Sequence, residues 1–164
     1  MNRKEKTKFL SDLLVQEKLN QRGTYWASEV TLNMGTSNMK RVDFMRFEPV
    51  NQSVSGIEKG VFICYEVKSC REDFKSGNGV NFVGDKNYIV TDMETYKKIV
   101  NDIPWRVGVM VPIPFMRDKH DEFDSPTNLE TDIRWEMKVI KYAGVKDRVY
   151  SMCELLFCML RSGK

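Results

Sequence analysis

Two charged side chains, Glu66 and Lys68, interrupt an apolar run in the segment FICYEVKSCREDF, residues 62–74. Residues two apart on a β-strand point to the same side, so both project from the face that also carries Phe62 and Cys64. An unpaired charge inside a buried strand costs on the order of several kcal/mol. Either the two groups pair with each other, or they face a polar site that uses them. A carboxylate beside an ammonium group can bind a divalent metal and steer a water molecule, as phosphodiester cleavage requires.

A metal site needs further oxygen ligands, and the upstream segment KRVDFMRF supplies a second acid, Asp43. Mg²⁺ is commonly held by one or two carboxylates together with water and a substrate phosphate. Asp43, Glu66 and the backbone carbonyl of Val67 would therefore be sufficient protein ligands. Glu29, in the segment WASEV, is a further acid that could join them.

The same E-x-K pattern occurs a second time, at Glu136 and Lys138 in RWEMK. There the apolar residues Trp135, Met137 and Val139 take the opposite face, so we interpret this copy as a solvated pair that contributes roughly a few tenths of a kcal/mol. Around Glu66 both faces of the strand are largely apolar, and the charge there needs another explanation.

The elements that must position these residues follow from hydrophobic periodicity. An amphipathic stripe predicts a first helix over residues 4–20. Alternating polarity predicts a hairpin of two strands, residues 26–33 and 40–47, and the strongest strand signal covers residues 61–69. Ser69 and Glu72 have the spacing of a capping box, which predicts a short helix that ends at Gly77 or Gly79.

The rest of the chain continues the alternation of strands and helices. Further strands are predicted at 87–90, 106–113 and 132–143, and further helices at 91–100 and 151–162; residues 49–60 and 117–132 are predicted to be polar connections. This order predicts an α/β (α+β) fold with a mixed central sheet flanked by helices, including a β-α-β unit with parallel strands.

Composition limits the class of protein. A length of 164 residues suits one domain, residues 1–164, and 41% apolar with 30% charged residues is typical of a globular chain. No apolar run is long enough for a membrane span and the start MNRKEKTKF lacks a signal segment, so a cytoplasmic protein without a membrane partner is expected.

The four cysteines are predicted to be reduced thiols. The one histidine, His120, argues against Ser-His-Asp or imidazole-based metal chemistry, whereas a carboxylate metal site is compatible with this composition.

These elements and motifs resemble the PD-(D/E)XK nuclease superfamily: a helix, a hairpin bearing VDF, and a strand bearing EVK followed by a short helix with DF. The likeness covers about residues 5–113, with residues 114–164 as C-terminal additions. The run EVKSCREDF most resembles small bacterial and phage members, including those similar to MmcB-type DNA-repair nucleases. The resemblance implies a restriction-endonuclease-like αβββαβ core, a Mg²⁺ or Mn²⁺ cofactor, and a DNA substrate met in phage or bacterial repair, recombination or processing.

Carried over by motif, the resemblance makes Asp43 the motif aspartate, Glu66 the second acid, Lys68 the motif lysine and Glu29 an auxiliary acid. The chain departs from the family pattern in two ways. Val42, not proline, precedes Asp43, and no clear glutamine or lysine marks the helix after the motif strand. Lys75 and Lys86 are candidates for that role.

The leading hypothesis is therefore a Mg²⁺- or Mn²⁺-dependent deoxyribonuclease, with Asp43, Glu66 and Lys68 catalytic and Asp43, Glu66, Val67 and Glu29 around the metal. The alternative is a catalytically silent nucleic-acid-binding or regulatory module of the same fold. A third interpretation is a structural or protein-binding domain in which Glu66 and Lys68 simply pair.

The tryptophans are interpreted as packing residues, with Trp26 or Tyr25 considered for stacking on a base. The oligomeric state is left open, with a homodimer among the options.

Overall fold

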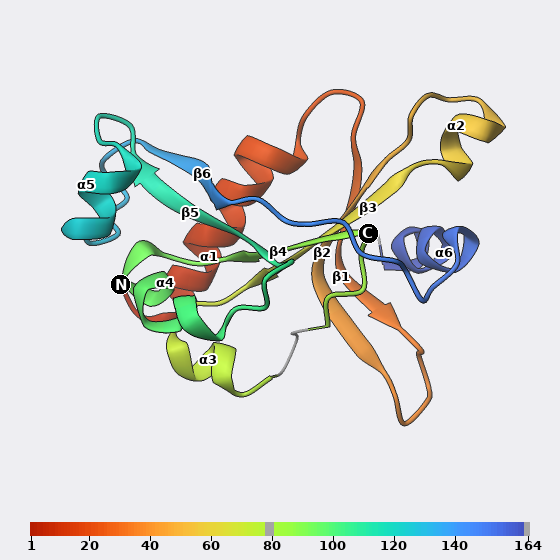
Figure 1. Cartoon of the computed structure of the whole chain (residues 1–164), viewed down its shortest axis with the longest axis horizontal. Coiled ribbons are helices and arrows are strands. Elements are labelled where there is room, and N and C mark those ends of the chain that lie inside the picture. The colour runs from red at the N-terminus through yellow and green to blue at the C-terminus, as the bar shows by residue number, and fades with distance from the viewer. Residues whose placement is uncertain (78–80, 163–164) are drawn as a thin grey trace.

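Six strands form one mixed sheet in the computed structural model, which describes residues 1–77 and 81–162 (Figure 1). The strands follow one another across the sheet in chain order: β1 (Tyr25–Leu32), β2 (Lys40–Glu48), β3 (Val61–Val67), β4 (Lys86–Val90), β5 (Gly108–Pro114) and β6 (Trp135–Lys141). The pairs β3–β4 and β4–β5 are parallel, and the other three pairs are antiparallel. The predicted fold class, a mixed sheet flanked by helices, is confirmed.

The helices alternate with the strands along the chain. They are α1 (Arg3–Leu14), extended by a π-helical turn (Val15–Leu19), α2 (Val54–Glu58), α3 (Arg71–Lys75), α4 (Met93–Ile99), a 3-10 turn (Val100–Asp102), α5 (Lys119–Asp124) and α6 (Met152–Ser162). Parallel strands need crossover connections, and α3 and α4 lie in the two that join β3, β4 and β5. No helix within the described ranges is both long enough and apolar enough to cross a membrane.

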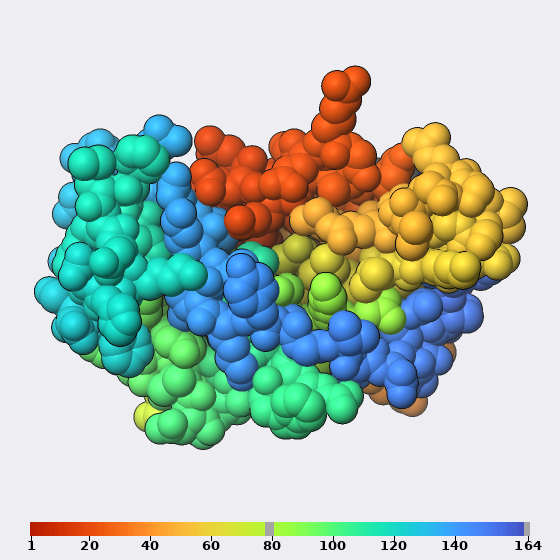
Figure 2. All heavy atoms as spheres, turned by 45° about the horizontal axis from the view of Figure 1, so that its top comes forward, coloured from red at the N-terminus to blue at the C-terminus, as the bar shows by residue number. Residues whose placement is uncertain are grey.

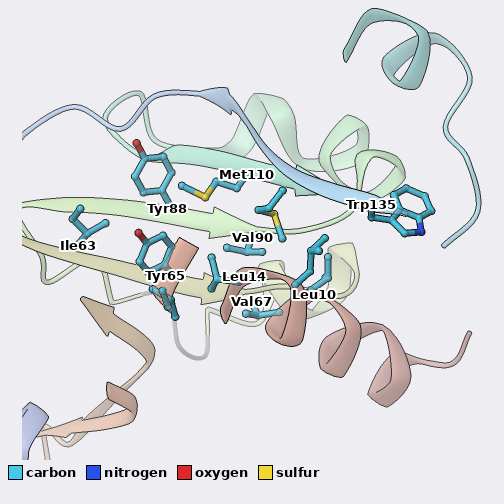
Figure 3. Close-up of a cluster of buried hydrophobic side chains, with 12 residues drawn as sticks. Leu10, Leu14, Ile63, Tyr65, Val67, Tyr88, Val90, Met110 and Trp135 are labelled. Atoms are coloured by element: carbon cyan, nitrogen blue, oxygen red, sulfur yellow. The ribbon is translucent and has the colours of Figure 1, made fainter. Parts of the chain in front are cut away.

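Helix α1 covers one face of the sheet. Its leucines pack on side chains of β3 and β4, and Figure 3 shows Leu10 and Leu14 lying beside Val67 and Val90. The opposite face is covered in two halves. Helix α6 packs over β1, β2 and β3 through Leu155, Cys158 and Met159, and α4 packs over β4 and β5 through Met93 and Ile99.

Strand β3 lies inside this sandwich and is buried on both faces, as its sequence predicts. Phe62 and Cys64 pack in the cluster under α6, whereas Ile63, Tyr65 and Val67 pack in the cluster under α1. The predicted alternation is thus confirmed, and Glu66 falls on the α6 side. The backbone N–H of Lys68 donates to the Val90 carbonyl at 2.9 Å, so pairing with β4 extends one residue past the end of β3.

Several local predictions need correction. The polar connections 49–60 and 117–132 each contain a short helix, α2 and α5, capped by the side chains of Ser53 and Asp118. Helix α3 begins at Arg71 with Cys70 as its N-cap and no side-chain cap, so the capping box predicted at Ser69 is not formed. The helix ends before Gly77, whose φ of 71° suits glycine. The alternative end at Gly79 lies outside the described residues.

The C-terminal segment is part of the sheet rather than an appendage to it. Strand β6 pairs antiparallel with β5, and α6 packs against β1. The connection between them, residues 142–151, runs across the molecule toward α6 and is the blue band in Figure 2. Asp85 fixes this connection, since its carboxylate accepts from Arg148 Nε at 2.9 Å and from the Phe62 N–H at 2.8 Å.

Candidate active site

The candidate site lies where β2 and β3 part from each other. Their antiparallel pairing ends at Phe44 and Tyr65. Among the described residues, β2 before Phe44 pairs only with β1, and β3 beyond Tyr65 pairs only with β4. Extending the register by one residue would set Asp43 opposite Glu66. The two acids that the sequence singles out therefore stand on either side of this fork.

In β1 and β2 the alternation of side chains between the two faces of the sheet shifts by one residue, and this shift turns Asp43 toward the fork. Val42 and Met45, three residues apart, both pack under α6, and so do Ala27 and Val30 on the neighbouring strand. Regular strands would place such residues on opposite faces. The shift coincides with Glu29, whose φ of 54° is uncommon for a residue other than glycine.

Asp43 caps the end of the β2–β3 ladder. Its Oδ2 accepts a hydrogen bond from the Val67 N–H at 2.8 Å, which replaces the strand partner that Val67 lacks on this side. Burial raises the pKa of Asp43, while this hydrogen bond and the positive charge of Lys68 act in the opposite direction. Part of the Asp43 carboxylate still faces the adjacent cleft.

Glu66 is buried, with 1% of its surface exposed, and its carboxylate oxygens have no close hydrogen-bond partner among the described residues. The Asn81 backbone N–H approaches the carboxylate and acts to lower its pKa. Burial is the main cause that raises the pKa of Glu66 to about 9, and the nearby Asp43 carboxylate raises it further, while the charge of Lys68 opposes both. Two buried oxygens without close partners are costly in a folded protein. They are therefore suited to a cationic ligand between Glu66 and Asp43.

Lys68 follows directly after β3 and is 3% exposed. Its positive charge opposes the burial that raises the pKa of Asp43 and Glu66, so the three side chains interact electrostatically. The structure thus brings together the acid from β2, the acid from β3 and the lysine, as the sequence predicts.

A cleft of about 1050 Å³ opens beside these residues. One wall is α1, with Arg3, Thr7 and Ser11, and the other is the β1–β2 hairpin, which projects from the sheet in Figure 1. Asp43, Val67 and Lys68 line it, whereas Glu66 lies behind this surface. The lining carries both signs of charge: Arg3, Lys40, Arg41 and Lys68 stand beside Asp12, Glu29, Asp43 and Asp73. The basic side chains on both walls could bind an anionic ligand.

The predicted auxiliary acid Glu29 and a further acid, Asp73, lie at the margin of the site. Glu29 lines the cleft, is exposed, and pairs with Arg41 at 3.2 Å. Asp73 accepts from Arg3 at 2.9 Å and from the Ser69 N–H at 3.4 Å. Across residues 1–77 and 81–162, no group of three or more histidine, cysteine, aspartate or glutamate side chains is arranged to hold a metal ion. Direct ligation by Glu29 thus stays a prediction.

The two lysines considered for the helix after the motif strand lie elsewhere. Lys75 ends α3 and pairs with Asp102 at 3.0 Å, and Lys86 begins β4 opposite Ile63. Neither is among the residues that line the cleft.

The second E-x-K copy behaves as a surface pair. The side chains of Glu136 and Lys138 approach each other to 2.7 Å on a solvent-facing side of β6, while Trp135 and Met137 are buried on the other side. This interpretation of the sequence is confirmed, and the pair offers a matched control for Glu66 and Lys68.

Sequence reasoning missed Asn81, which stands at the open side of the fork. Its side-chain amide donates to the Arg41 carbonyl at 2.8 Å, in the part of β2 that β3 does not reach, and the residue lines the cleft. A polar residue in a loop carries no signal of such a role, because the contact depends on how the chain returns after α3.

Fold and site together define a mixed α/β protein with two carboxylates and a lysine at a fork in its sheet. Comparison with family models gives no match, and comparison with curated proteins gives none either. Among solved structures, the chain is similar to SPO1766, a protein of unknown function from Silicibacter pomeroyi. The TM-score is 0.58 at 17% identity, over 93% of this chain and 82% of that one. At this identity the likeness concerns the fold alone.

Proposed function

We propose that this chain is a divalent-metal-dependent nuclease that hydrolyses DNA phosphodiester bonds. The observation that supports the proposal is Glu66, a buried carboxylate whose oxygens lack a close hydrogen-bond partner among the described residues. It interacts with Asp43 and Lys68 beside a cleft of mixed charge. The donor set is chemically suited to Mg²⁺ or Mn²⁺, which prefer carboxylate and carbonyl oxygen.

Asp43 and Glu66 would hold the cation, with the Val67 carbonyl as a third protein ligand and Glu29 as an auxiliary acid. When bound, the cation supplies positive charge that stabilises the phosphodiester as it becomes more negative in the transition state. Lys68 donates hydrogen bonds to the attacking water and to the same developing charge. Arg3, Lys40 and Arg41 attract the phosphate backbone into the cleft.

The catalytically silent module explains the acids less well. Carboxylates beside a phosphate-binding cleft repel the ligand unless a cation neutralises them. A structural role is also unfavourable, since buried ion pairs seldom stabilise a fold relative to apolar residues of the same volume. Binding a metal gives both buried acids a favourable partner.

The direct test is a cleavage assay with labelled single-stranded, duplex and branched DNA, and RNA, in Mg²⁺, Mn²⁺ or EDTA. Asp43→Asn, Glu66→Gln and Lys68→Ala are compared with the wild type. We expect metal-dependent cutting that falls by about 10²-fold or more in each variant, the loss typical of removing a group that stabilises transition-state charge. Glu136→Gln and Lys138→Ala, which alter the surface copy of the motif, should cut like the wild type.

Two results would overturn the proposal. Cutting of equal strength in the wild type and in Lys68→Ala would place the activity elsewhere. Metal-independent binding of DNA without any cutting, unaffected by Lys68→Ala, would instead identify the catalytically silent module.

A further inference from the structure

We infer that the cleft takes a single nucleic-acid strand and that one of its bases stacks on Trp26. This inference rests on the proposed function and names the substrate class of the same site. It concerns a residue of β1 that the metal and lysine chemistry does not use.

Trp26 is held in place by its neighbours and lines the cleft. Its indole N–H donates to the Asn20 side-chain oxygen at 3.2 Å, and its ring packs at 6.2 Å from that of Phe44, tilted by 48°. Because the indole N–H already has a partner, the remaining way for Trp26 to bind a ligand is through its ring. The ring is partly exposed, unlike that of Trp135, which is buried.

The position of Trp26 relative to Asp43 suits a strand that passes the metal site. Phe44 follows Asp43 in β2, pairs with Ser28 of β1, and contacts the Trp26 ring, so the two rings adjoin the fork. Lys40 and Arg41 belong to the same hairpin, and Arg3 faces them from α1. Arg41 pairs with Glu29 and Arg3 pairs with Asp73, so a bound phosphate would compete with these carboxylates for the two arginines. Positive side chains beside an aromatic ring are the combination by which proteins bind single strands without sequence readout.

A duplex is less compatible with this arrangement. Stacking on a side chain needs a base that has left its pair and its neighbours, which costs free energy in a duplex and little in a single strand. The cleft is also lined on two sides, by residues of α1 and of the β1–β2 hairpin.

The test measures binding in Glu66→Gln protein with EDTA present, so that cleavage does not interfere. The probe is a labelled oligothymidylate of about 12 nucleotides, within the usual site size for single strands, beside a hairpin duplex of the same length. We expect tighter binding of the single strand, weakened about tenfold or more by Trp26→Leu and partly restored by Trp26→Phe. Trp105→Leu is the matched control, because Trp105 is 76% exposed, lies under Arg106 and does not line the cleft. Quenching of tryptophan fluorescence by the oligonucleotide should disappear only in the Trp26 variants.

The inference fails if Trp26→Leu, folded by circular dichroism, binds the single strand as tightly as Trp105→Leu does, or if the duplex binds more tightly. Such a result leaves the nuclease proposal standing as long as Lys68→Ala still abolishes cleavage. Conversely, binding that depends on Trp26 in a wild-type protein that does not cleave would support the single-strand inference and contradict the nuclease proposal.

Discussion

Two glutamates in this protein are equally buried, each about 1% exposed, and they differ in their partners. Glu122 accepts from Arg117 at 2.8 Å and from the Thr127 N–H at 3.0 Å. Glu66 has no close partner of this kind among the described residues. Glu122 is thus a satisfied structural carboxylate, whereas Glu66 makes the fold less stable and is suited to an added cation.

The two residues should therefore respond in opposite ways to the same change. In metal-free protein at about pH 8, we expect Glu66→Gln to raise the free energy of unfolding by about 1–3 kcal/mol. Glu66 is ionised in the unfolded chain and must take up a proton to be buried, whereas the amide is neutral in both states. Glu122→Gln should lower it by a similar amount, since it loses charged hydrogen bonds. Denaturant unfolding measures both.

The sign of the pH dependence gives a further check on Glu66. Its pKa is raised from 4.5 to about 9, so the protonated group stabilises the fold at low pH and this stabilisation is lost as the pH rises toward 9. The advantage of Glu66→Gln should thus be small near pH 5 and grow with pH. Destabilisation by Glu66→Gln at every pH would instead indicate a structural pair with Lys68.

At the scale of elements, sequence alone predicts what depends on local pattern. The burial of β3 on both faces, the hairpin that carries Asp43 and the solvated Glu136–Lys138 pair all follow from alternation. The fork does not, because it depends on where β2 leaves β3 and on a phase shift shared by two strands. The helices α2 and α5 did carry local signals, the caps Ser53 and Asp118, but each is too short for a periodic stripe.

Asp85 directly precedes β4 and links it to the start of β3 and to the connection before α6. No local sequence pattern connects these three segments, so Asp85 offers a test at the scale of elements. Its carboxylate ties the start of β3 to Arg148 of the connection before α6. Asp85→Ala leaves the buried Phe62 N–H without that acceptor, so we expect the free energy of unfolding to fall by about 1–3 kcal/mol and the amide of Phe62 to exchange faster. Asp147→Ala, at an exposed position of the same connection, should change stability by less than about 0.5 kcal/mol.

For the whole molecule, net charge is a weak guide to the ligand, since +3 at pH 7 is small for a chain of 164 residues. The placement of charge is more informative. Basic side chains line both walls of the cleft together with Asp12, Glu29 and Asp73, and the two acids of the fork lie at its base and behind it. Binding of a cation at the fork would stabilise the native protein by mass action and change the cleft from mixed charge to positive.

The central claim, that Asp43 and Glu66 together bind a divalent cation, is tested most directly by calorimetric titration of Mn²⁺ into wild type, Glu66→Gln and Glu136→Gln. Since the pKa of Glu66 is about 9, the cation must displace a proton. We predict one site whose affinity increases by up to about tenfold per pH unit between about pH 6.5 and pH 8.5, with proton release. The site should be lost in Glu66→Gln and kept in Glu136→Gln. Equal binding by all three proteins, or affinity independent of pH, would contradict the account.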